Sequence, residues 1–284
     1  MRIAISADST CDMPEHLVQK YDFRLNAMPF SLGEKLCHDG IDGTGKDVFE
    51  YVEKTKELPK TSAINEMQYK EYFNRLLEKY DAVVHLTLSS GLTSSVAHAQ
   101  TVVEKMKNVY VIDTLSLSTG ISLLGLYAKE LADAGATPEE IVEKVSARIP
   151  YVQASFVVER LDYLYKGGRC SALSLFGANL LKIRPQIVVK DGKMKPAKKY
   201  RGKMGRVIES YSQDTLAEFN TPDKKIAFIT YTTASEEMIE PAKKALTNAG
   251  FKTIIESQAG GTITSHCGEH VLGILYLNDG DNIQ

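Results

Sequence analysis

Short apolar runs alternate with segments of helical periodicity through the first half of the chain. The alternating segments, in chain order, are Arg2–Ser6, Glu66–Tyr80, Ala82–Leu88, Val109–Ile112 and Thr119–Ala134. The second and the last are long enough for helices, whereas the other three are short and apolar, as buried strands are. Strands separated by helices usually pair in parallel and are covered on both faces. We therefore predict an α/β region with a mainly parallel sheet and flanking helices.

Two polar clusters predict further helix starts in this half. Thr137-Pro-Glu-Glu140 supplies the N-cap, the proline and the N3 acid of a capping box for a helix over Ile141–Ile149. Asp12-Met-Pro-Glu15 has the same order of residue types, so we expect Asp12 to be the N-cap of another helix.

The second half of the chain has hairpin signals in place of a regular alternation of strands and helices. Asp191-Gly192 is a strong hairpin signal, and a helix is expected to end at Ala249-Gly250. Hairpins mixed with helices predict an α+β region with antiparallel strands. The expected strands are Ser155–Val158, Gln186–Lys190, Lys193–Lys198, Lys225–Thr230, Thr253–Glu256 and Gly273–Leu277.

A length of 284 residues exceeds what one hydrophobic core usually serves, so we expect two domains. The change of pattern places their boundary near Ile149-Pro150. The prediction is an N-terminal α/β domain over residues 1–150 and a C-terminal α+β domain over residues 151–284. The segment 61–80 is compatible with packing on either domain.

Charge and cysteine usage narrow the class of partner and the compartment. The chain has 34 basic and 36 acidic residues, a net charge of −2, so no basic excess favours nucleic acid. Four cysteines stand far apart, as in a reducing compartment. No run approaches the ~18 apolar residues of a membrane span, and the first residues lack the apolar core of a signal peptide. We expect a cytoplasmic protein that, if it handles lipid, does so as a soluble carrier.

Hydroxyl side chains gather in two places. Thr61-Ser62 forms one pair, and Ser89-Ser-Gly-Leu-Thr93-Ser94-Ser95 follows a predicted buried strand and precedes a helix. Free N–H groups and the positive end of a helix dipole favour an anion at such a position. The residues alone equally allow a serine-rich loop that merely caps the helix.

Other site types are disfavoured by what their motifs lack. Gly40-Ile-Asp-Gly-Thr-Gly45-Lys46-Asp47 has the spacing of a phosphate loop, but Asp47 replaces the required hydroxyl and no buried strand leads in. His266 and His270 have i, i+4 spacing without the glutamate of a zinc motif, so we expect no metal. The G-x-S-x-G elbow of a serine hydrolase is absent.

Two arginines remain as candidates for an anion site. Arg169 follows a Gly-Gly turn, and Arg201 lies in the basic stretch Lys198-Lys-Tyr-Arg-Gly-Lys203. A guanidinium can pair with a carboxylate through two hydrogen bonds. The basic stretch is also suited to contact with a partner protein.

Taken in order, these segments resemble the DegV family of bacterial fatty-acid-binding proteins. The resemblance extends from residue 8 to residue 268, and the Lys-Gly-Gly-Arg segment is its most specific part. The matching segments are Asp8-Ser-Thr10, Asp39-Gly40, Thr61-Ser62, Ser89–Ser95, Val111-Ile-Asp113-Thr114 with Ser118, Leu164-Tyr-Lys-Gly-Gly-Arg169, Ile183-Arg-Pro185, Asp191-Gly192, Arg201-Gly202 and Ser265-His266-Cys-Gly268.

The resemblance implies a two-domain fold with a buried acyl tunnel between the domains. It implies one bound long-chain fatty acid and no cofactor. Its carboxylate would be bound by Thr61 and Thr93, with His266 and Arg169 completing the network and Ser62 and Ser94 beside them.

Similar proteins are the binding subunits of bacterial fatty acid kinase, in which a separate ATP-binding protein phosphorylates the carboxylate. Arg201 matches a position near the kinase docking surface. We expect a monomer that is not itself an enzyme, with transient membrane contact left open.

The sequence departs from the family pattern in two loops. Thr93 and Ser94 replace a serine and a glycine, and Cys267-Gly268-Glu269-His270 replaces a more usual Thr-Gly-Pro-Gly. Met28, Phe30 and Phe176 are our expectations for tunnel-lining residues. The competing interpretations are a hydrolase or phosphotransferase that uses the hydroxyl loop and His266, and a regulatory protein without a ligand.

Overall fold

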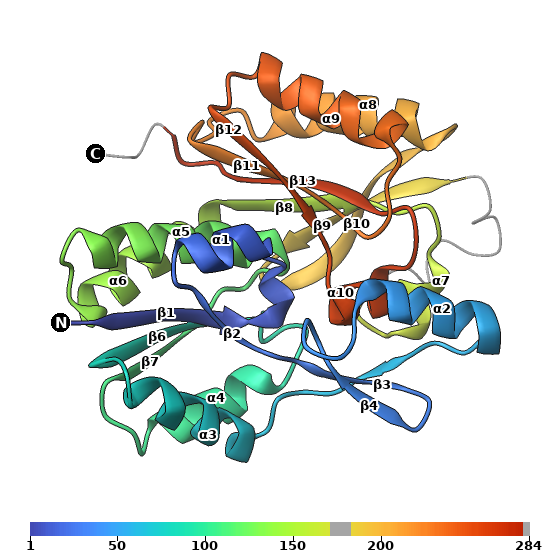
Figure 1. Ribbon diagram of the computed structural model, residues 1–284. Helices are drawn as coiled ribbons and strands as arrows, with labels where there is room; N and C mark the ends of the chain where they lie inside the picture. The colour runs from blue at the N-terminus through green and yellow to red at the C-terminus, as the bar shows by residue number, and fades with distance from the viewer. Residues whose placement is uncertain (171–182, 281–284) are drawn as a thin grey trace.

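The computed structural model describes residues 1–170 and 183–280, and its first large sheet is entirely parallel. The strand order is β2-β1-β6-β7 (Figure 1). The bounds are β1 Ile3–Asp8, β2 Arg24–Asn26, β6 Ala82–Thr87 and β7 Val109–Asp113. All six residues of β6 are buried, as expected for a central parallel strand covered on both faces.

Helices cover both faces of this sheet (Figure 1). One face carries α3 Glu66–Leu77 and α4 Ser95–Val103; the other carries α1 Glu15–Lys20, α5 Thr119–Asp133 and α6 Pro138–Arg148. The predicted capping box at Thr137 and Glu140 is present and opens α6. The capping box of α3, formed by Asn65 and Gln68, was not predicted.

The second large sheet is mixed, with strand order β10-β9-β8-β13-β11-β12. Its strands are β8 Val152–Val157, β9 Arg184–Lys190, β10 Lys193–Tyr200, β11 Ile226–Tyr231, β12 Thr253–Gln258 and β13 Leu272–Leu277. Only β11 and β12 pair in parallel. The predicted hairpin at Asp191-Gly192 is confirmed, since both residues have the positive φ of a primed turn.

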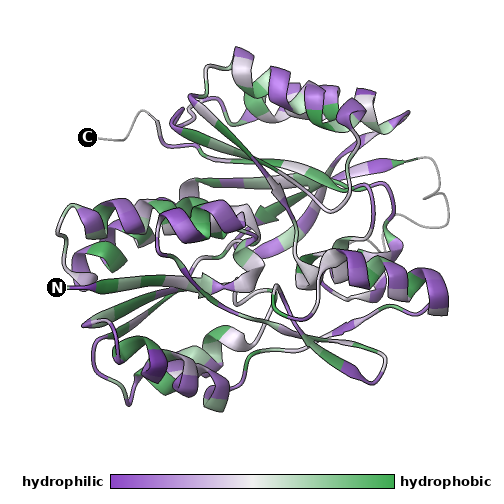
Figure 2. Ribbon diagram, in the orientation of Figure 1, coloured by the Kyte–Doolittle hydropathy of each residue, from purple (hydrophilic) through white to green (hydrophobic). Residues whose placement is uncertain are grey.

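The two sheets are stacked with helices between and outside them (Figure 1). The helices α8 Met204–Glu218 and α9 Glu236–Asn248 cover the outer face of the mixed sheet, while α5 contacts β8, β11 and β13 on its inner face. One apolar core therefore extends from the parallel sheet through α5 to the mixed sheet. Figure 2 shows the apolar residues concentrated on the strands and α5, with polar residues along α8 and α9.

A third, small sheet lies beside both domains. Its order is β4-β3-β5, with β3 Pro29–Leu32, β4 Lys35–His38 and β5 Lys60–Thr61. The helix α2 Gly45–Thr55 packs against α10 Gly261–Cys267, which in turn contacts α7 Asp162–Lys166 (Figure 1). Three helices that are far apart in the sequence thus lie together beside the small sheet.

The predicted α/β class is confirmed, with a parallel first sheet and antiparallel strands in the second domain. The proposed boundary near Ile149 stays a prediction; the parallel sheet ends at Asp113 and the mixed sheet begins at Val152. The 61–80 segment is divided, since Thr61 belongs to the small sheet and α3 packs on β6.

One predicted helix start is wrong. Pro14, not Asp12, is the N-cap of α1. Asp12 has a φ of 49° and is buried, and its carboxylate accepts a hydrogen bond from the backbone N–H of Gly260 in the other half of the chain. A local motif therefore suggested a cap, whereas a distant donor determines where this side chain points.

The helices α2, α8 and α10 and the small sheet were not predicted. Thr44 and Asp47 form the capping box of α2, so the segment tested as a phosphate loop is a helix start. Asp47 stands at the position where that loop requires Ser or Thr.

Candidate functional site

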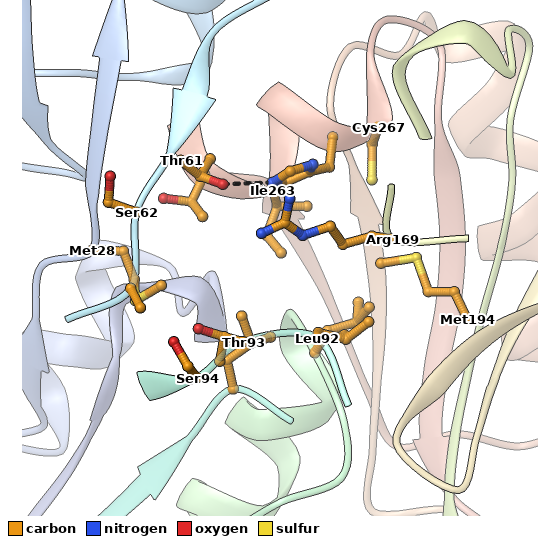
Figure 3. Close-up of a pocket in the computed structure, with 15 residues that line it drawn as sticks. Met28, Thr61, Ser62, Leu92, Thr93, Ser94, Arg169, Met194, Ile263 and Cys267 are labelled. Carbon is orange, nitrogen blue, oxygen red and sulfur yellow. Dashed lines mark hydrogen bonds between the residues drawn. The ribbon is translucent and has the colours of Figure 1, made fainter. Parts of the chain in front are cut away.

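A cavity of about 140 Å³ lies where the small sheet, the serine-rich loop Ser89–Ser95 and α10 meet (Figure 3). Both halves of the chain contribute side chains to it. The lining residues are Met28, Thr61, Ser62, Ala63, Leu88, Leu92, Thr93, Ser94, Leu117, Arg169, Met194, Thr262, Ile263, His266 and Cys267. The structure thus brings together all six residues that the sequence suggested for a carboxylate site.

Thr61 and His266 are joined directly across the cavity wall (Figure 3). Thr61 ends β5, which pairs with β3 through Phe30 and Thr61. His266 is in the last turn of α10, and its Nε2 lies 2.7 Å from the Thr61 Oγ1. The hydrogen bond connects residues 205 positions apart in the sequence.

Burial and charge keep the His266 imidazole neutral. Burial first, and the Arg169 guanidinium second, lower the pKa of His266 from 6.5 to about 4. Its Nδ1 is buried without a hydrogen-bond partner in the described part of the chain. An unpartnered acceptor costs less here than an unpartnered N–H, so we assign the proton to Nε2. His266 then donates to Thr61, and the Thr61 hydroxyl keeps its own proton for a ligand.

Thr93 is held by the start of α4. Its Oγ1 accepts a hydrogen bond from the Ser95 backbone N–H at 3.2 Å and lies 2.9 Å from the Ser95 Oγ. The Ser95 Oγ in turn accepts the backbone N–H of Ile64 at 3.1 Å. When Ser95 donates to Thr93, the Thr93 hydroxyl is free to donate into the cavity.

Three of the expected residues form the solvent-facing rim. Ser62, Ser94 and Arg169 are exposed. The Arg169 Nη1 donates to the Gly167 carbonyl oxygen at 2.8 Å, and no acidic side chain among the described residues forms an ion pair with it. Its positive charge is therefore available to an anion entering the cavity.

Arg201 is separate from this group. It is exposed and follows β10, and it does not line the cavity. Its assigned role at a partner surface stays a prediction.

The Lys-Gly-Gly-Arg segment positions His266 as well as Arg169. A Cβ at Gly167 would lie 2.5 Å from the His266 Nδ1, so only glycine permits this approach. Gly168 has a φ of 69°, which favours glycine for a second reason. The arginine was predicted from the sequence, but this role of Gly167 was not, because the contact with α10 is a tertiary one.

A smaller and mainly apolar cavity of about 30 Å³ lies behind the first. It is bounded by β8, β11 and β13 of the mixed sheet. Three residues line both cavities and form the wall between them: Leu117, Ile263 and Cys267. These residues, with Leu92 and Met194, were not predicted, because a single sequence does not show which apolar residues face a cavity.

The expected tunnel-lining residues fall in three different places. Met28 lines the first cavity. Phe30 lines neither cavity; it packs with Cys37 and Val48 in a small core under α10. Phe176 lies outside the described residues.

A Ser–His–Asp chain exists, but it lies away from the cavity. Ser6 Oγ is 2.8 Å from the His85 Nδ1, and the His85 Nε2 is 3.2 Å from the Asp8 Oδ1. All three residues are fully buried and line neither cavity. A hydrolase site needs an accessible nucleophile, so this arrangement gives the hydrolase interpretation no support.

Among the described residues, no group of three or more His, Cys, Asp or Glu side chains is arranged to hold a metal ion. None of the helices in that part of the chain is long and apolar enough to cross a membrane.

The whole chain is similar to known proteins. It is 31% identical over 281 residues to a DegV domain-containing protein of Caldanaerobacter subterraneus subsp. tengcongensis, covering 97% of this chain and 98% of the relative. It is also 31% identical to a protein of Thermotoga maritima named fatty acid-binding protein, covering 96% of each. The crystal structure of DegV from Bacillus subtilis, described as a fatty acid binding protein, superposes with a TM-score of 0.85 at 25% identity over 98% of this chain and 99% of that one.

The Bacillus subtilis structure has the same fold, and both sequence relatives extend over nearly the full length of the chain. A family model described as uncharacterised protein, DegV family, matches residues 2–279, and the chain therefore belongs to the DegV family.

Proposed function

We propose that this protein binds one long-chain fatty acid, with its carboxylate at Thr61 and Thr93 and its acyl chain directed past Leu117 and Ile263. The observation that supports this most directly is the pair of adjoining cavities. The outer one has hydroxyl, imidazole and guanidinium groups, and the inner one is mainly apolar. That division matches a ligand with one polar end and a long apolar tail.

The polar end of the site suits a carboxylate. Its donors are two hydroxyls aligned by His266 and Ser95, with the Arg169 charge at the rim. A buried anion without partners is costly, and charge-assisted hydrogen bonds offset that cost. Ser62 and Ser94 supply further hydroxyls on the exposed side.

The acyl chain supplies most of the driving force. Burial of about 16 methylenes at ~0.8 kcal/mol each amounts to on the order of 12 kcal/mol before ordering losses. The chain must pass between Leu117, Ile263 and Cys267, which separate the two cavities. We expect these side chains to move apart when the ligand enters.

The carrier presents its ligand to a separate ATP-dependent fatty acid kinase. A carboxylate oxygen attacks the γ-phosphorus, the bond to ADP breaks, and an acyl phosphate forms. Exposure of Ser62 and Ser94 leaves the carboxylate end open to such a partner, and exposed Arg201 is available for docking. In this proposal the protein acts as a cytoplasmic monomer.

Mass spectrometry of an organic-solvent extract tests the central claim. Protein purified without denaturation should yield about one C14–C20 fatty acid per chain. An empty extract, together with no uptake of added oleate or palmitate, would contradict the carrier function and leave the fold unchanged.

A further inference from the structure

Two buried aspartates from the first half of the chain hold the first turn of α10. Asp39 Oδ1 accepts the backbone N–H of Gly261 at 2.6 Å, and its Oδ2 accepts that of Thr262 at 3.1 Å. Asp12 Oδ1 accepts the backbone N–H of Gly260 at 2.8 Å. The N-terminal N–H groups of a helix have no partner within the helix, so these carboxylates satisfy them.

The fit around Asp39 is close. Asp39 is 3% exposed, and a Cβ at Gly260 would lie 2.7 Å from its Oδ1. The Asp39 backbone N–H donates to the Met28 carbonyl oxygen at 2.9 Å, immediately before β3. Asp39 therefore connects α10 to the small sheet through both its side chain and its backbone.

This connection joins the two elements that hold the ligand-binding pair. Thr61 lies on β5, which pairs with β3, and His266 lies on α10. Asp39 does not line the cavity. Any displacement of α10 from the small sheet would lengthen the 2.7 Å contact between Thr61 and His266.

We propose that Asp39 is a positioning residue for carboxylate binding: it fixes α10 against the small sheet so that His266 aligns the Thr61 hydroxyl. The inference rests on the proposed function. It predicts that loss of the Asp39 contacts weakens recognition of the carboxylate more than binding of the acyl chain, for which α10 supplies only Ile263 and Cys267.

The two aspartates differ in a way that supplies a matched control. Both Asp39 oxygens accept N–H groups, so the NH₂ of Asp39→Asn would face a donor. Asp12 accepts one N–H and one hydroxyl, from Ser118, and an asparagine can accept the first and donate to the second. Burial also raises the pKa of Asp12 to about 8, so a neutral amide resembles the form favoured near neutral pH.

The experiment compares oleate with oleyl alcohol, which has the same chain and no carboxylate, by isothermal titration calorimetry. For Asp39→Asn we expect about tenfold weaker oleate binding and a smaller loss, of about threefold or less, for the alcohol. Asp12→Asn should change neither by more than about threefold. Gly260→Ala keeps both aspartates but crowds Asp39. If Asp39→Asn does not fold, Gly260→Ala replaces it and should show the same larger loss for oleate than for the alcohol.

A second readout needs no ligand. NMR titration of the His266 ring should show its pKa rising from about 4 toward 6.5 in Asp39→Asn, because α10 no longer keeps the ring from water. Equal losses for oleate and the alcohol, or an unchanged His266 pKa, would overturn the positioning role. Wild-type protein that binds neither ligand would refute the proposed function itself.

Discussion

Two histidines, one fully buried in the parallel sheet and one partly buried beside the cavity, show how differently the same side chain can be used. His85 lies in the core of the parallel sheet with partners on both ring nitrogens, Ser6 and Asp8. His266 lies beside the cavity with one partner, Thr61, and its Nδ1 has no hydrogen-bond partner among the described residues. A fully satisfied network has no capacity left for a ligand, whereas a partly satisfied one beside a cavity does.

The surroundings of the two rings agree with this contrast. Three aromatic rings, those of Tyr69, Tyr72 and Phe73, lie with their centroids 5.2–5.8 Å from that of His85. His266 instead lines the cavity to which both halves of the chain contribute side chains. The comparison predicts that the first network determines stability and the second determines binding.

The largest expected effect is on stability, from Asp8→Ala. The Asp8 carboxylate accepts hydrogen bonds from Tyr69 at 2.8 Å and from the Leu88 N–H at 3.1 Å, besides its contact with His85. Their loss in a dry core should lower the free energy of unfolding by about 4 kcal/mol. Urea denaturation measures this. A loss below about 1 kcal/mol would show that the His85 network is not structural.

The second largest effect is expected on the pH dependence of stability, through the titration of His266. Its pKa is about 4 in the folded protein against 6.5 unfolded, so its contribution to stability is complete above pH 6.5 and is lost as the pH falls toward 4. We expect this contribution to be about 2 kcal/mol, less than the full shift implies, because the ring borders the cavity.

Urea denaturation of the wild type and of His266→Gln at several pH values measures the contribution of His266. The contributions of the other titrating groups cancel when the two free energies of unfolding are subtracted. The free-energy difference between the two proteins should shrink between pH 6.5 and pH 4. Parallel stability profiles would contradict the neutral state assigned to His266.

Features set by local sequence could be predicted, whereas features set by contacts between distant residues could not. The periodic segments of α3 and α5 and the Asp191-Gly192 turn are local signals, and the structure has these elements close to where they were expected. The small sheet was missed because β5 has two residues and no periodicity. Asp12 was misassigned because its partners, Ser118 and Gly260, are distant in the sequence.

The candidate site was predicted from residue types and from a family resemblance, which together named the side chains but not their support. Thr61 and His266 form the site only because a hydrogen bond joins them across 205 positions of the sequence. Gly167 and Asp39 were unrecognised because their roles depend on the approach of α10. Positioning residues of this kind carry no chemical signature of their own in one sequence.

The smallest expected effect is from Thr93→Ala, on the ligand-binding side of the comparison. Removing one hydroxyl donor should weaken oleate binding by about 1 kcal/mol, roughly fivefold, with no loss of stability beyond about 0.5 kcal/mol. Thr93 is partly exposed and lines the cavity, where water can take the place of its hydroxyl beside the buried Ser95. Calorimetric titration with oleate measures the affinity, and Thr93→Ser, which keeps the hydroxyl, is the matched control. If Thr93→Ala unfolds the protein or leaves oleate affinity unchanged, Thr93 belongs with the structural network of His85 and not with the site of His266.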